Sequence, residues 1–136
     1  MNLDRAFISD IQRIIAGARE RAVQSVNFER VAMYWQIGQR IKEEEQQGEE
    51  RAEYGTSLIK SLAETLEPQH GSGFSARQLE LCRQFYRTFP NSNALSSQFS
   101  WTHYRLLVRI DNQDKRAFYI AEGVKNSWTA REMERQ

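Results

Sequence analysis

The sequence predicts an all-α fold in which a long N-terminal helical hairpin is followed by a helix-turn-helix-like bundle of about five shorter helices. Apolar residues recur at spacings of three and four along most of the chain, and no segment sustains the period-two alternation of a strand. Ser75 and Thr129 stand three residues before Gln78 and Glu132, a signature of helix starts. A chain of 136 residues can bury a core without disulfides or metals. We therefore expect one helical domain over 1–136, with sub-lobes of about 1–50 and 51–136.

The first 47 residues predict two helices that pack as an antiparallel hairpin. The first helix, over about 3–26, has an apolar stripe at helical spacing that consists of Leu3, Phe7, Ile11, Ile14, Ala18 and Ala22. Asn27 is a suitable N-cap for a second helix, whose stripe consists of Phe28, Val31, Trp35, Gly38 and Ile41. A glycine inside a helix costs about 1 kcal/mol relative to alanine, so Gly17 and Gly38 indicate close helix approach. The segment 43–53 has six glutamates and predicts a solvated helix end followed by a connector.

Two further helices are predicted in the middle of the chain. The first covers 54–66 and is closed by Pro68; its buried side is expected to be Leu58, Ile59, Leu62, Ala63 and Leu66. After a polar loop over 69–73, Ser75 and Gln78 form a capping box, with Phe74 as half of a hydrophobic staple. The helix that they start is ended by Pro90, and its core face is predicted to be Leu79, Cys82, Phe85, Tyr86 and Phe89.

The C-terminal part predicts three short helices. Ser100 caps the first, whose inward side chains are expected to be Trp101, Tyr104, Leu107 and Val108. A helix over 113–125 has a predicted core face of Ala117, Phe118, Ala121 and Val124. Thr129 and Glu132 form the capping box of a last helix that runs to the end of the sequence.

Charge is unevenly distributed along the chain, although the net charge is only +1. Residues 1–66 hold 9 basic and 11 acidic side chains, whereas residues 67–136 hold 10 basic and 7 acidic ones. Between positions 75 and 109 every cation is an arginine and the only acid is Glu80. Arginine suits bidentate contacts with phosphates and base edges. The alternative is that these arginines lie on ordinary solvated helix faces.

Helix pairs joined by a connection occur twice, over 54–66 with 75–89 and over 113–125 with 129–136. The second connection is short, as in DNA-binding helix-turn-helix motifs. Together with the outward arginines, these pairs give a set of candidate nucleic-acid-binding residues. They are Arg77, Gln84, Arg87, Arg105, Arg109, Arg131 and Arg135.

No complete catalytic, metal or cofactor site is predicted. His70 and His103 are isolated, and we expect them in a loop and on a helix face. The segment 71–73 lacks the strand and lysine of a phosphate loop, while Ser75 and Ser100 have sufficient roles as helix caps. Cys82 cannot form an internal disulfide and is expected to be a buried thiol in a reducing compartment. With no apolar run near the roughly 20 residues of a membrane span, we expect a cytoplasmic protein without membrane contact.

Five segments resemble the N-terminal domain of the bacterial YhcG family. They are YWQIG at 34–38, GFSARQL at 73–79, RQFY at 83–86 with Phe89-Pro90, SWTHYRLL at 100–107 and WTAREMERQ at 128–136. The resemblance covers nearly the whole chain, and it implies a C-terminal nuclease-like domain of the PD-(D/E)xK type beyond these residues. A weaker likeness, through HYRLL and WTAREME, is to the helical DNA-binding part of ParB-type partition proteins.

The resemblance implies a DNA-binding and targeting module for an attached nuclease domain, without catalysis of its own. The alternative is a homodimerisation or protein-interaction module built on the 3–47 hairpin, which needs no direct DNA contact. Because two-fold DNA-binding proteins read two half-sites, a homodimer is compatible with either function.

Overall fold

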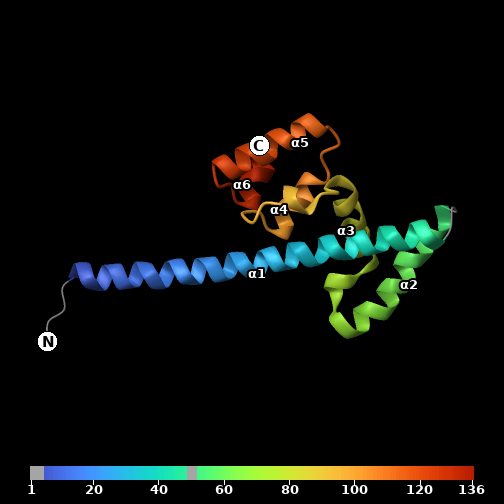
Figure 1. Cartoon of the computed structure of the whole chain (residues 1–136), viewed down its shortest axis with the longest axis horizontal. Coiled ribbons are helices and arrows are strands. Elements are labelled where there is room, and N and C mark those ends of the chain that lie inside the picture. Colours follow the sequence, from blue (N-terminus) through green and yellow to red (C-terminus); the bar gives the residue numbers. More distant parts are fainter. Residues whose placement is uncertain (1–4, 49–51) are drawn as a thin grey trace.

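The computed structural model describes residues 5–48 and 52–136, and these residues form an all-α fold, as predicted. No strand occurs in the described ranges. Figure 1 shows a long helix, α1 (Arg5–Gly48), with α2 (Ala52–His70) returning along one side. A lobe of α4 (Trp101–Leu107), α5 (Gln113–Lys125) and α6 (Ala130–Arg135) lies on the other side. Among the described helices, none is both long and apolar enough to cross a membrane.

The predicted N-terminal hairpin is wrong, because α1 runs without interruption over Arg5–Gly48. Between residues 18 and 37 the sequence has no proline or glycine that could turn the chain. Asn27, which we expected to cap a second helix, costs less than about 1 kcal/mol inside a helix. The two apolar stripes therefore lie on different sides of one helix. Leu3 lies outside the described residues.

The second stripe of α1 packs on α3, which spans Ala76–Thr88. Val31, Trp35 and Ile41 are buried, and the indole Nε1 of Trp35 donates a hydrogen bond of 2.7 Å to the carbonyl oxygen of Phe89. Gly38 lies against the backbone of α3, since a Cβ there would lie 2.7 Å from the carbonyl carbon of Cys82. Gly38 therefore marks a close helix approach, whereas Gly17 has only the flexible end of Arg21 beside it.

The helix α2 spans Ala52–His70 and is longer than predicted, because it continues through Pro68. It ends at Gly71, whose φ of 93° suits the end of a helix and whose N–H donates to the carbonyl oxygen of Glu67 at 2.8 Å. A short 3-10 helix, η1, follows over Ser72–Phe74. The predicted cap of α3 is confirmed, since the Ser75 side chain accepts a hydrogen bond from the Gln78 N–H.

The largest core joins α1 and α3 to the C-terminal lobe through aromatic side chains. The ring of Phe85 lies 5.2 Å from that of Trp101 and 4.9 Å from that of Tyr104. Tyr34 of α1 reaches the same cluster, with its ring 4.7 Å from that of Trp101. The four residues of α4 (Trp101–Leu107) and its end that were predicted to face inward are all buried. Three lie within the helix, and the fourth, Val108, directly follows it.

The lobe continues with η2 (Ser92–Ala94) before α4, and with α5 (Gln113–Lys125) and α6 (Ala130–Arg135) after it. The predicted core face of α5 is largely wrong, because Ala117, Phe118 and Ala121 are exposed. Gly123 is the buried residue of α5, and Met133 and Phe99 close over it. A glycine contributes nothing to an apolar stripe, so the sequence pattern favoured the wrong side of this helix.

Cys82 lies on α3 and is fully buried in the core of the domain. Burial raises the pKa of its thiol from 9.0 to about 12. Burial likewise raises the pKa of Tyr104 from 10.0 to about 12. Both groups are neutral in the folded state, so the free energy of unfolding is undiminished by their burial below pH 9. The free energy of unfolding falls as the pH rises toward 12, because the unfolded chain then releases protons that the folded chain retains.

We therefore expect the free energy of unfolding, measured by urea denaturation, to begin falling above about pH 9. Cys82→Ala is expected to remove the earlier part of this fall and to leave the part due to Tyr104. Rapid reaction of the native protein with a thiol reagent at pH 8 would contradict the burial on which this expectation depends.

Candidate nucleic-acid interface

Four of the predicted binding residues gather where α3 meets the end of α4. The side-chain amide of Gln84 donates a hydrogen bond of 3.3 Å to the carbonyl oxygen of Val108, which places Gln84 next to Arg109 in the chain. Arg87 follows Gln84 by three residues on the same face of α3, and Arg105 precedes Arg109 by about one turn. We call Gln84, Arg87, Arg105 and Arg109 the α3–α4 basic group.

The three arginines of this group have no acidic partner among the described residues. Arg87 and Arg109 are exposed, and Arg105 is half-buried with an Nε atom that is buried and has no hydrogen-bond partner in the described part of the chain. Arg87 and Arg105 also lie in the last turns of their helices, where the helix dipole favours positive charge. Their guanidinium groups are thus available to an anionic ligand.

Arg83 of α3 differs from this group because it is held in ion pairs. Its Nη2 lies 2.9 Å from Glu45 Oε2 of α1, and its Nη1 lies 3.1 Å from Glu80 Oε1. The hydrogen bond with Glu45 is the main cause that raises the pKa of Arg83 above its ordinary value. Arg83 therefore fastens α3 to α1, which its position in the basic stretch of the sequence did not indicate.

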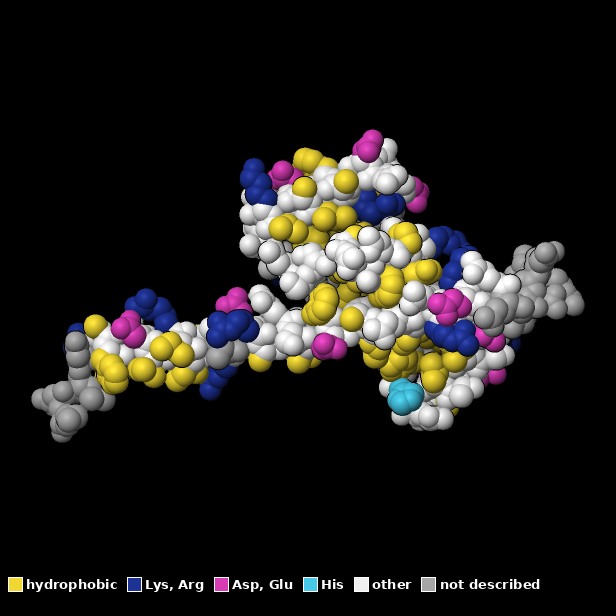
Figure 2. Space-filling model, viewed as in Figure 1, with side chains coloured by type: hydrophobic (Ala, Val, Ile, Leu, Met, Phe, Trp, Pro, Cys, Tyr) yellow, Lys and Arg dark blue, Asp and Glu magenta, His cyan; other side chains and the backbone are white. Residues whose placement is uncertain are grey.

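The remaining predicted residues lie apart from the basic group. Arg77 is exposed in the first turn of α3, about two turns before Gln84. Arg131 and Arg135 are exposed one turn apart on α6, and no hydrogen bond or ion pair between described residues links them to α3. On the face that Figure 2 shows, acidic side chains lie between the basic ones on the lobe above α1, so this face is not one wide basic surface.

The connection between α5 and α6 is short, as predicted, and is fixed by His103. The Nδ1 of His103 accepts a hydrogen bond of 3.0 Å from the Ser100 N–H, and its Nε2 lies 2.8 Å from the carbonyl oxygen of Trp128. The tautomer with a proton on Nε2 satisfies both contacts. His103 is 6% exposed, so our expectation of a helix-face residue is wrong, and the side chain stabilises the lobe.

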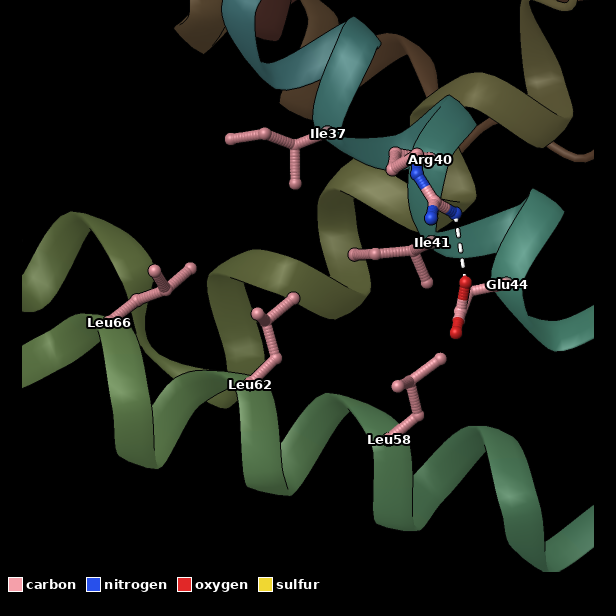
Figure 3. A pocket seen from close by; sticks show the side chains of 7 residues that line it. All are labelled: Ile37, Arg40, Ile41, Glu44, Leu58, Leu62 and Leu66. Carbon is pink, nitrogen blue, oxygen red and sulfur yellow. Dashed lines mark hydrogen bonds and ion pairs between the residues drawn. The ribbon is translucent and has the colours of Figure 1, made fainter. Parts of the chain in front are cut away.

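The two larger hollows found among the described residues lie outside the basic group. One is a polar cavity of about 700 Å³ between α1 and the C-terminal lobe, where Glu20 and Gln24 face Ser100 and His103. The other is an apolar groove of about 400 Å³ between α1 and α2. In Figure 3, Leu58, Leu62 and Leu66 of α2 point toward Ile37 and Ile41 of α1, with the Arg40–Glu44 ion pair of 3.0 Å at the rim. Within the described residues, no three His, Cys, Asp or Glu side chains are placed to hold a metal ion.

Comparison with known proteins assigns the family of this helical domain. Residues 10–136 match the model of the DUF1016 N-terminal domain, and the chain belongs to this family. The chain is 33% identical over 158 aligned positions to the Escherichia coli (strain K12) protein named "Putative nuclease YhcG". The alignment covers 93% of this chain and 42% of that relative, so the chain spans less than half of the relative's length. No solved structure matches the chain significantly.

Proposed function

We propose that this chain is a DNA-binding and targeting module for a PD-(D/E)xK nuclease domain carried by the same protein. The observation that carries the proposal is the α3–α4 basic group, in which three arginines with no acidic partner among the described residues lie near one helix junction. Phosphate contacts supply most of the affinity of non-specific DNA binding, and arginine is well suited to make them. The similarity to a protein named as a nuclease supports a nucleic-acid partner for the full-length protein.

Arg77, Arg131 and Arg135 remain in the proposal as additional phosphate contacts. They extend the proposed surface along α3 and onto α6, where the helix after a short turn presents exposed arginines. The buried aromatic core holds α3 and α4 in one rigid arrangement, so the basic group is positioned before any ligand binds. The module is proposed to be non-catalytic and to need no cofactor.

The test is fluorescence anisotropy with labelled duplex, single-stranded and branched DNA at about 50 and 200 mM salt. We expect affinity to fall steeply with salt. In the double variant Arg105→Gln and Arg109→Gln, the slope of log K against log salt should decrease by about 2, because each lost phosphate contact accounts for roughly 0.9. Affinity at low salt should fall at least about tenfold.

A matched control removes the same two charges from arginines that are already paired. Arg13→Gln with Arg40→Gln removes the partners of Asp10 and Glu44 and should change DNA affinity little. An equal loss in both double variants would mean that net charge, and not the α3–α4 basic group, determines binding. Absence of binding by the unmodified protein at 50 mM salt would exclude the proposed function.

A second candidate function is homodimerisation, and one observation favours it. Large apolar side chains of the N-terminal half of α1, among them Phe7, Ile14 and Val26, are more than half exposed. Exposed apolar surface of this extent is typical of interaction sites. Dimerisation is compatible with DNA binding, because a two-fold protein presents two copies of the same basic group.

A further inference from the structure

The N-terminal half of α1 has an apolar face that no other described element covers. We call it the α1 stripe; its members are between 39% and 70% exposed and are Phe7, Ile8, Ile11, Ile14, Ile15 and Val26. At 1.5 Å per residue, the stretch from residue 7 to 26 is about 30 Å long. Figure 2 shows hydrophobic side chains along one edge of this projecting half of the helix. A face of this length is large enough to bind another helix along its whole length.

Most charged side chains of the same helical segment lie away from this face, and Arg19, one turn after Ile15, lies on it. At 100° per residue, Asp10, Arg13 and Glu20 lie well away from Ile11 and Ile15, and Asp10 and Arg13 form an ion pair of 3.2 Å. Val23 lies roughly one quarter-turn or more from the centre of the stripe, although it is also exposed. The segment is therefore an amphipathic helix with one apolar face and no partner for it within the described chain.

Farther along α1, the edge of this face on which Val26 lies is covered by an antiparallel helix of this chain. Ile37 follows Val26 by 11 residues, which is close to three turns, and so lies on the same side. There it lines the apolar groove with Leu62 and Leu66 of α2, which runs back along α1 in Figure 1. The covering helix that fits the α1 stripe is thus a second antiparallel amphipathic helix.

We infer that this second helix is the α1 helix of another copy of the chain, bound through its own α1 stripe about a two-fold axis near residues 16 and 17. This inference deepens the second candidate function and does not depend on DNA binding. The distribution of side-chain size favours it: isoleucines fill the first half of the segment, and the small residues Ala22 and Ser25 lie in the second half. The two-fold pairing sets Ile11 of one copy against Ala22 of the other, and Ile8 against Ser25.

A parallel pair would be packed less evenly than this antiparallel pair. It would place Ile11 against Ile11 and Ala22 against Ala22, so one half would be crowded and the other thin. In the antiparallel register, residue 5 of the second copy reaches about residue 28 of the first. Residue 28 precedes Tyr34, whose hydroxyl donates to the Gly73 carbonyl oxygen at 3.1 Å and marks where η1 meets α1. Residues 5–28 of the second copy therefore fit without displacing α2 or η1.

The pair of stripes would bury about 1,000 Å² in total, at the low end of specific interfaces, which predicts a micromolar dimer. Sedimentation equilibrium of the 136-residue chain at roughly 1 to 100 μM tests this. We expect a monomer–dimer equilibrium, weakened at least about 100-fold by Ile11→Glu with Ile15→Glu. Val23→Glu, on the same helix but outside the stripe, is the matched control and should dimerise like the unmodified chain. A monomer at every concentration, a larger assembly, or equal weakening by Val23→Glu would overturn the inference.

Cross-linking tests the orientation of the pair. Oxidation of an equal mixture of Ile8→Cys and Ser25→Cys chains should give dimers joined between positions 8 and 25, while Cys82 stays unreactive because it is buried. Efficient self-cross-linking of the Ile8→Cys chain alone would indicate a parallel pair and overturn the inference. DNA anisotropy on both proteins keeps the two functions separate. DNA binding by the monomeric Ile11→Glu, Ile15→Glu variant would support the DNA-binding module. Absence of DNA binding by the dimeric unmodified chain would exclude the module.

Discussion

Gly38→Ala is expected to destabilise the protein by about 3 kcal/mol or more, the upper range for overpacking. The added Cβ would collide with the Cys82 carbonyl group, at 2.7 Å from its carbon, and would lie 3.1 Å from the Cβ of Tyr86. Backbone cannot rotate away as a side chain can, so α1 and α3 must separate. Separation would loosen the hydrogen bond from Trp35 to Phe89 and the ion pairs of Arg83 with Glu45. Urea unfolding followed by circular dichroism measures the change as a lower midpoint.

Gly17→Ala is the matched control in the same helix. A Cβ at position 17 would meet only the Nη1 of Arg21, at 3.3 Å, and that flexible side chain can move. The substitution should therefore stabilise the helix by up to about 1 kcal/mol, the propensity difference between the two residues. If both substitutions destabilise the protein, the lack of room for a Cβ at position 38 is not the reason that glycine is required there.

The sequence predicted the local structure better than the way in which the elements pack. The starts of α3 and α6 followed from Ser75 and Thr129, because a cap is a contact between residues three positions apart. The predicted hairpin was wrong because the apolar stripe changes sides near Asn27, and such a change is compatible with two structures. It can mark a turn between two helices, or one helix that has different neighbours along its length.

The basic group shows the same division between local and long-range information. Helical spacing placed Arg87 and Arg109 on outward faces, and both are exposed. Gln84 joins α3 to the end of α4 through a contact with a residue 24 positions away. Arg83 pairs with Glu45, which lies 38 positions away. No pattern within one helix carries this information. The role of His103 was also hidden, because its hydrogen-bond partner at Trp128 lies 25 residues away.

Phe85→Ala is expected to cost 3 to 5 kcal/mol, about the usual loss for a buried phenylalanine. The Phe85 side chain is fully buried, and its ring contacts Phe89, Trp101 and Tyr104, so a cavity would open where α3 meets α4. Phe118→Ala provides the control, because Phe118 is 58% exposed on α5 and should lose less than about 1 kcal/mol. If the basic group binds DNA as a rigid unit, Phe85→Ala should weaken DNA binding in proportion to the fraction of unfolded protein. Urea unfolding measures that fraction, and anisotropy on the same samples measures the DNA affinity. Undiminished DNA binding by the unfolded variant would show that affinity comes from charge alone and not from the arrangement that the aromatic core maintains.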